Sequence, residues 1–99
     1  MTFRAPARDL AFALKTIGHS DLLARAYPDQ DEDTVQAVLE AAAAFADNEL
    51  APLNWSGDRE GARYENGRVT AAPGFAGAYR HFVEQGWNSL SADPEHGGQ

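Results

Sequence analysis

Apolar residues recur at helical spacing in the first quarter of the chain and predict two helices. The first is expected over residues 7–17, set up by Pro6 and stopped by Gly18, because proline suits the start of a helix and glycine its end. The second is expected over residues 20–26 and ends before Pro28, since a residue that precedes proline avoids helical geometry. The apolar members of the first helix are Leu10, Phe12, Leu14 and Ile17.

A longer apolar pattern predicts the main helix. Asp33 is the expected N-cap, and Gln36 three residues later completes a capping box. Pro52 predicts a kink or an end near the last turn, because proline lacks the backbone N–H of a helix interior. The apolar positions, which recur every three or four residues, are Val35, Val38, Leu39, Ala42, Phe45, Ala46, Leu50 and Leu53.

The segment 54–74, NWSGDREGARYENGRVTAAPG, is rich in glycine and turn residues. Asn66-Gly67 predicts a β-hairpin there, because both central residues of a type I′ turn need positive φ. Two strands alone are marginal, so the hairpin is expected to lie on something else. A further helix starts near Phe75 and closes at Gly86, and Trp87 begins a closing segment. The pattern predicts an all-α fold, an incomplete bundle of about three to four helices with one small β-hairpin insert.

Composition predicts a thin core for this fold. Nineteen of the 99 residues are alanine, and Leu, Ile, Val and Phe together number 18. Alanine buries little apolar area, and burial is the main favourable term in folding. We therefore expect marginal stability or self-association through uncovered apolar faces.

Charge and cysteine content exclude several classes of function. The net charge is −7 and the chain has no cysteine, so a nucleic-acid or anionic-lipid surface, a disulfide framework and a thiolate metal site are not expected. No apolar run approaches the length of a membrane span. A soluble, cytoplasmic protein is predicted.

Two patterns suggest metal ligands, and neither suffices. Asp29, Asp31 and Asp33 precede Glu40 at the spacing of a calcium loop, but Thr34 stands where that loop needs glycine. His81 and Glu84 lie three apart on one predicted helix without an evident third ligand. We predict no metal site.

No catalytic pattern is present either. His19 stands beside Asp21 at a loop-to-helix junction, where helix capping explains it, and the serines form no nucleophile motif. The chain also lacks the glycine-rich phosphate loops. Taken alone, the residues predict no catalytic and no cofactor-binding group.

Residues 45–99 nevertheless resemble the N-terminal helical domain of acyl-CoA dehydrogenases, in the branch that has an extra N-terminal helical segment. FRAPARDLAFAL at residues 3–14 is similar to the opening of that branch. The marks of the resemblance, in order, are Phe45-Ala46, Leu50-Ala51-Pro52-Leu53-Asn54, Asp58 with Gly61, Pro73-Gly74-Phe75 with Ala78-Tyr79, and Gly86-Trp87, Leu90 and Pro94-Glu95-x-Gly97-Gly98.

The resemblance implies a 1–30 helical extension and a 31–99 dehydrogenase domain that is incomplete at its C-terminal end. It implies a parent flavoenzyme that uses FAD to oxidise acyl-CoA thioesters between the α and β carbons, as in fatty acid metabolism. The flavin contacts and the catalytic glutamate of the family lie in middle and C-terminal domains that this chain lacks. Activity of the 99 residues alone is therefore not expected, and a homo-oligomer or a self-associating fragment is.

The resemblance also implies one place near the substrate. The turn that matches Pro94, Glu95, His96, Gly97 and Gly98 runs close to the acyl-chain pocket in the family, and its glycines permit close backbone approach. Because the family continues beyond this turn into a further helix, the chain is expected to be truncated there. The alternative is a self-contained helical interaction module that receives a partner helix on the face of Leu39, Phe45, Leu50 and Leu53.

Overall fold

A computed structural model describes residues 2–99 of the chain. The chain divides into two compact units, an N-terminal unit that ends at Ala51 and a C-terminal unit from Pro52 to Gln99. The predicted domain boundary at residues 30 and 31 concerns the parent enzyme and stays a prediction.

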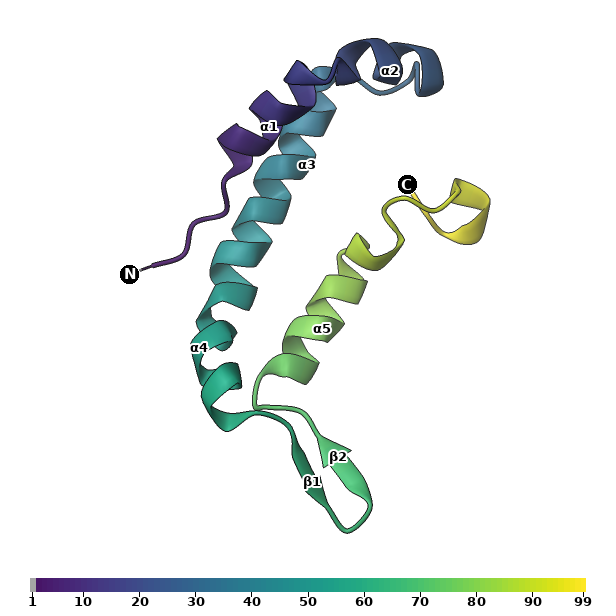
Figure 1. The fold of residues 1–99 in the computed structure, drawn as a ribbon. Coiled ribbons are helices and arrows are strands. Elements are labelled where there is room, and N and C mark those ends of the chain that lie inside the picture. Colours follow the sequence, from purple (N-terminus) through teal and green to yellow (C-terminus); the bar gives the residue numbers. More distant parts are fainter. Residues whose placement is uncertain (1) are drawn as a thin grey trace. The chain divides into compact units, whose positions relative to one another are not determined.

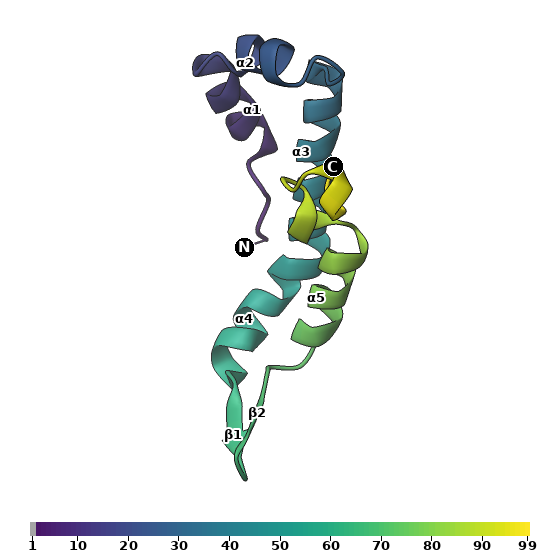
Figure 2. The same cartoon turned by 90° about the vertical axis from the view of Figure 1, so that its right-hand side faces the viewer.

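The N-terminal unit is an antiparallel helix pair with a short helix across one end (Figures 1 and 2). The short helix α2 follows the end of α1 and leads into the start of α3. Phe45, at the end of α3, is buried. The elements of this unit are α1 (Ala7–Thr16), α2 (His19–Ala26), α3 (Glu32–Phe45) and the π-helical segment η1 (Ala46–Leu50).

The N-cap of α3 is Asp31, so the prediction of Asp33 was wrong. Asp31 has an extended backbone, and its carboxylate accepts the backbone N–H of Thr34 at 2.8 Å. Asp33 instead lies within the first helical turn, where an acid is favourable beside the helix N-terminus. The predicted capping box is also wrong, because the Gln36 amide donates to the carboxylate of Glu40 at 3.0 Å.

Helical structure continues beyond Pro52, so the turn-rich interpretation of residues 54–60 was wrong. Pro52 is the second residue of α4 (Ala51–Glu60), inside a continuous helical run, so the helix has to accommodate its missing N–H there. The π-helical segment η1 precedes it, and the N–H of Ala51 bonds to the carbonyl of Ala46. Such a bulge inserts one residue into the ladder and lets the backbone accommodate proline.

The C-terminal unit joins α4 to α5 through the hairpin (Figure 1). Buried Gly57 on α4 lies against the ring of Phe75, and Gly74 lies against the side chain of Leu53. Ala72, just before this contact, is buried. The remaining elements are β1 (Arg63–Glu65), β2 (Arg68–Thr70), α5 (Phe75–Glu84) and the 3₁₀ turns η2 (Trp87–Ser89) and η3 (Pro94–His96).

The hairpin forms as predicted, in the antiparallel register that pairs Tyr64 with Val69. Asn66 and Gly67 have φ of 52° and 76°, which are the positive values that the turn requires. Tyr64 and Val69 are 74% and 70% exposed. The other elements of the C-terminal unit therefore leave these two hairpin side chains uncovered.

The fold class agrees with the sequence analysis. With α3, η1 and α4 counted as one continuous helical run, the part of the chain that the structure describes has four helices and one two-stranded hairpin. An all-α fold with a small β insert is confirmed. Gly86, with φ of 80°, ends α5 as predicted.

Candidate functional site

The five residues predicted near the substrate, Pro94 to Gly98, form one tight turn at the end of the chain. Asp93 precedes it with an extended backbone, and its carboxylate accepts the N–H of Glu95 at 3.1 Å. Pro94 suits the first position of the 3₁₀ turn η3, because its φ is already restricted to helical values. The turn is thus built by local hydrogen bonds.

Backbone contacts close this turn against the residues before it. The N–H of Gly98 donates to the carbonyl of Asp93 at 3.0 Å, and the Ser89 hydroxyl donates to the carbonyl of Gly97 at 3.4 Å. A Cβ atom on Gly98 would lie 1.8 Å from the carbonyl oxygen of Ala92. Since that neighbour is backbone, only glycine fits at position 98.

The side chains of the turn face solvent. His96 and Glu95 are both exposed, and the His96 Nε2 lies 4.0 Å from a carboxylate oxygen of Glu95. An exposed pair of this kind interacts weakly. The turn therefore has a backbone fixed by hydrogen bonds and an exposed imidazole. Its place beside an acyl chain stays a prediction.

The acidic segment before α3 does not form a calcium loop. The carboxylate of Asp31 accepts bonds from the backbone N–H and the hydroxyl of Thr34, and these bonds hold the pKa of Asp31 below its ordinary value of 3.8. Thr34 and Asp33 are already helical. Within residues 2–99, no three His, Asp or Glu side chains gather closely enough to hold a metal ion.

His19 does not cap α2, so that interpretation was wrong. It is the first residue of α2, and α2 begins without a side-chain cap. Both imidazole nitrogens are buried, and neither has a hydrogen-bond partner. A buried polar group without a partner destabilises the folded state by about 1–3 kcal/mol.

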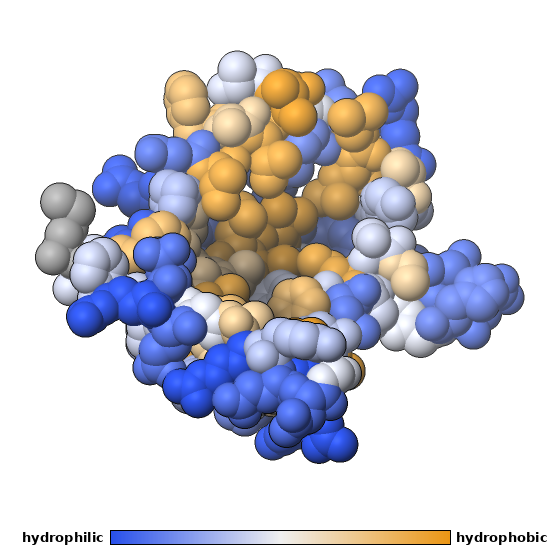
Figure 3. Space-filling view, turned by 60° about the horizontal axis from the view of Figure 1, so that its bottom comes forward, coloured by the Kyte–Doolittle hydropathy of each residue, from blue (hydrophilic) through white to orange (hydrophobic). Residues whose placement is uncertain are grey.

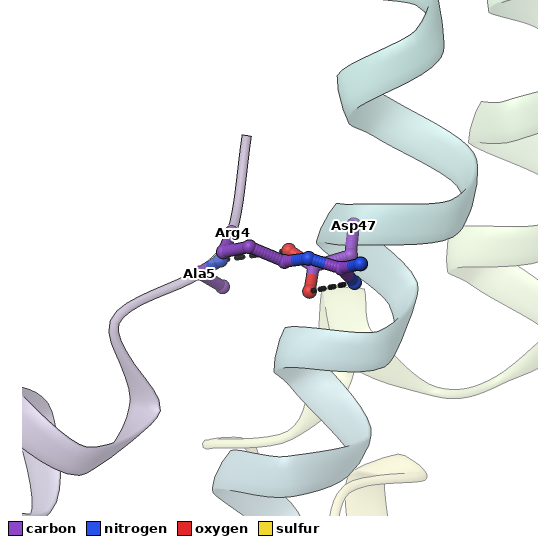
Figure 4. A network of polar contacts seen from close by, with 3 residues as sticks. All are labelled: Arg4, Ala5 and Asp47. Carbon is purple, nitrogen blue, oxygen red and sulfur yellow. Dashed lines mark hydrogen bonds and ion pairs between the residues drawn. The ribbon is translucent and has the colours of Figure 1, made fainter. Parts of the chain in front are cut away.

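Asp47 is a polar contact that the sequence analysis missed (Figure 4). Its side chain is only 16% exposed. One carboxylate oxygen accepts the N–H of Ala5 at 2.7 Å, and the other lies 3.6 Å from the Arg4 guanidinium. Through these two contacts, Asp47 links the segment before α1 to the π-helical segment η1.

The hollows on the described surface include three open ones. The first, of about 420 Å³, is lined by Arg63, Glu65, Asn66, Arg68 and Thr70. The second, of about 290 Å³, is lined by Trp55, Ser56, Arg59 and Glu60. The third, of about 160 Å³, is lined by Ala11, Leu14, Lys15, His19, Glu32, Val35, Gln36 and Leu39.

Helices in the described range are too short or too polar for a bilayer crossing.

Comparison with known proteins agrees with the resemblance in the sequence. The chain matches no protein-family profile. It is 42% identical, over 99% of its length, to 3-methylmercaptopropionyl-CoA dehydrogenase of Ruegeria pomeroyi. The match covers the N-terminal 17% of that protein, so the chain spans about a sixth of the relative's length. The predicted resemblance to the N-terminal part of an acyl-CoA dehydrogenase is thereby confirmed.

Proposed function

We propose that this chain is the N-terminal helical part of an FAD-dependent acyl-CoA dehydrogenase. The observation that carries the proposal is the 42% identity over the whole chain to the start of 3-methylmercaptopropionyl-CoA dehydrogenase. The parent enzyme would remove hydrogen from the α and β carbons of an acyl-CoA thioester and leave a double bond between them. Its substrate class would include short acyl-CoA thioesters such as the one in the relative's name.

The flavin and the catalytic base would come from parts of the parent enzyme outside this chain. We assign no residue of this chain to the flavin and no glutamate of it to the base. What the 99 residues contribute is structure. The helices form one wall, and the Pro94–Gly98 turn brings a shaped backbone close to the acyl chain, with His96 at its surface.

The exposed apolar surface supports a larger parent. Fourteen large apolar side chains are exposed, whereas Phe45 and Ala72 are the buried apolar residues of the described range. Apolar residues lie open beside hydrophilic ones in the space-filling view (Figure 3). So many exposed large apolar side chains beside so few buried ones are typical of a segment that packs against other parts of a protein. We propose that the middle and C-terminal domains, or a second subunit, cover part of it.

The alternative of a self-contained module is less well supported. Its proposed docking face includes Phe45, which is already buried by the chain itself. Leu39 and Leu53, on the same predicted face, are only partly exposed, whereas Leu50 is exposed. A partner helix would therefore meet one open side chain out of four.

A chimeric enzyme tests the proposal. This chain replaces the matching N-terminal 17% of the Ruegeria protein, and the control is the Ruegeria protein with that part deleted. We expect the chimera to retain flavin and to oxidise 3-methylmercaptopropionyl-CoA, and the deletion variant to lose activity. A folded chimera that holds flavin but does not turn over, beside an active parent, would refute the proposal.

A second variant tests the turn in the same chimera. Gly98→Ala would force the backbone away from Ala92, where its Cβ would overlap the carbonyl oxygen. We expect a higher KM for the acyl-CoA with flavin content unchanged. Gly77→Ala is the matched control, because Gly77 has no positive φ and its Cβ would meet nothing within 4 Å. Equal KM values in the two variants would show that the turn lies away from the substrate.

A further inference from the structure

The tip of the hairpin carries an asparagine followed by a glycine, and both residues are open to solvent. Asn66 and Gly67 form the turn between β1 and β2, and both are exposed. A Cβ atom added to Gly67 would meet nothing within 4 Å. In the described part of the chain, neither the side-chain amide of Asn66 nor the backbone N–H of Gly67 takes part in a hydrogen bond. These two groups are therefore adjacent, uncrowded and not engaged elsewhere.

The hairpin that holds this turn is weakly supported. β1 and β2 have three residues each, and Tyr64 and Val69, which pair across them, are both exposed. A two-stranded hairpin without a covered face is marginally stable, so its ladder opens locally at low cost. In the open form, Asn66 is released from its positive φ, and its side-chain carbonyl can approach the nitrogen of Gly67.

Positive charge lies on the surface that Asn66 shares. Asn66 lines the hollow of about 420 Å³ together with Arg63, Glu65, Arg68 and Thr70. In the register of the hairpin, Thr70 is opposite Arg63 and Glu65 is opposite Arg68, so these four residues lie on one face. Two guanidinium groups and one carboxylate leave this face positive. Such a surface favours negative charge that develops at Asn66.

We propose that Asn66 is a site of spontaneous deamidation. The backbone nitrogen of Gly67 loses its proton to the solvent and attacks the side-chain carbonyl carbon Cγ of Asn66, which closes a succinimide ring. The bond between Cγ and Nδ2 breaks, and Nδ2 leaves as ammonia with a proton taken from the solvent. Water then opens the ring at either carbonyl, so residue 66 becomes aspartate or isoaspartate. No group is oxidised or reduced, and water is the only other reactant.

The two products affect the hairpin differently. Aspartate leaves the main chain as it was, and Asp-Gly suits a type I′ turn as Asn-Gly does. Isoaspartate carries the main chain through Cγ and so adds a carbon atom to the turn. The turn that sets Glu65 opposite Arg68 then no longer closes, and the ladder is lost. The proposal goes beyond the dehydrogenase assignment and does not depend on it.

Ageing of the 99-residue chain tests the site. After incubation at neutral and at mildly alkaline pH, trypsin cuts after Arg63 and Arg68 and releases residues 64–68 as one peptide. We expect the mass of this peptide to rise as its amide becomes a carboxylic acid. The rate should increase with pH, because the backbone nitrogen must lose its proton before it attacks. No mass change, or the same rate at both pH values, would overturn the proposal.

Asn88 is the control within the same chain. It is also exposed, but it is followed by Ser89, whose N–H donates to the carbonyl of Gly86 at 3.2 Å. We expect Asn66 to lose its amide at least about tenfold faster than Asn88, because its nucleophile is free and its hairpin opens easily. Equal rates at the two asparagines would contradict the role of the turn.

Asn66→Asp separates the charge of the product from the change in the main chain. The isoaspartyl form of the aged chain is isolated by chromatography and compared with this variant by nuclear magnetic resonance. We expect the variant to keep the cross-strand contacts between Tyr64 and Val69, and the isoaspartyl form to lose them. Contacts that persist in the isoaspartyl form, or that are missing from the variant, would refute the predicted effect on the hairpin.

Discussion

Replacing Gly74 by alanine adds a single atom, the Cβ, where the segment before α5 contacts α4. Gly74 precedes α5 with φ of +90°, and an added Cβ would lie 2.6 Å from a methyl carbon of Leu53. The left-handed backbone costs a residue with a Cβ about 1–2 kcal/mol. The end of the Leu53 side chain must also shift, so we expect a loss of at least about 1–2 kcal/mol in the free energy of unfolding.

Gly77→Ala is the matched control, three residues further along. Gly77 lies inside α5 without a positive φ, and its Cβ would meet nothing within 4 Å. Alanine is favoured over glycine in a helix interior by about 0.8–1 kcal/mol. The two substitutions make the same chemical change, so their opposite signs would come from the local structure alone.

Urea unfolding of the 99-residue chain measures both variants. Far-ultraviolet circular dichroism follows the helices, and fluorescence follows Trp55 and Trp87, which both lie in the C-terminal unit. We expect the midpoint to fall for Gly74→Ala and to rise for Gly77→Ala. Midpoints that move in the same direction, or that differ by less than about 1 kcal/mol in free energy, would refute the packing described for Gly74.

Three further predictions follow from single side chains. Asp47→Ala removes a charged acceptor worth about 1.5–3 kcal/mol, so amide exchange at Ala5 should accelerate, and unchanged protection would contradict the contact. Because bonds from Thr34 lower the pKa of Asp31, its stabilisation of α3 is complete above the ordinary value of 3.8 and is lost as the pH falls through the lowered pKa. Circular dichroism in acid should therefore show α3 melting in the wild type, whereas in Asp31→Ala that pH-dependent step should be missing. His19→Leu removes two buried nitrogens without partners and should raise the free energy of unfolding by about 1 kcal/mol, and a lower Tm would show that the imidazole is satisfied.

Elements with strong local signals were predicted well. The Asn66-Gly67 turn, the glycine stop at Gly86 and the helices around them depend on backbone preferences of a few adjacent residues. The π-helical segment before Pro52 was not predictable in this way. Local rules treat proline as a kink or an end, whereas the structure continues the helix by shifting the ladder by one residue.

The local shape of the Pro94–Gly98 segment agrees with the sequence, whereas its place beside an acyl chain stays a prediction. The five residues from Pro94 to Gly98 were singled out by resemblance, and the structure brings them into one turn. Its dependence on Gly98 could not be predicted, because the contact involves the backbone of Ala92, which lies outside the motif. Contact between the turn and an acyl chain would also require the residues that line the rest of the substrate pocket in the proposed parent enzyme.

The sequence alone determined what depends on neighbours in the chain: the helical periodicity, the hairpin turn, the excess of acid and the likeness to an acyl-CoA dehydrogenase. Tertiary structure decided which polar groups form hydrogen bonds and which apolar side chains remain exposed to solvent. Asp47 binds the backbone of Ala5, 42 residues away, and His19 loses contact with water without gaining a partner. Burial and hydrogen bonding depend on distance in space, and local patterns do not specify which distant segments meet.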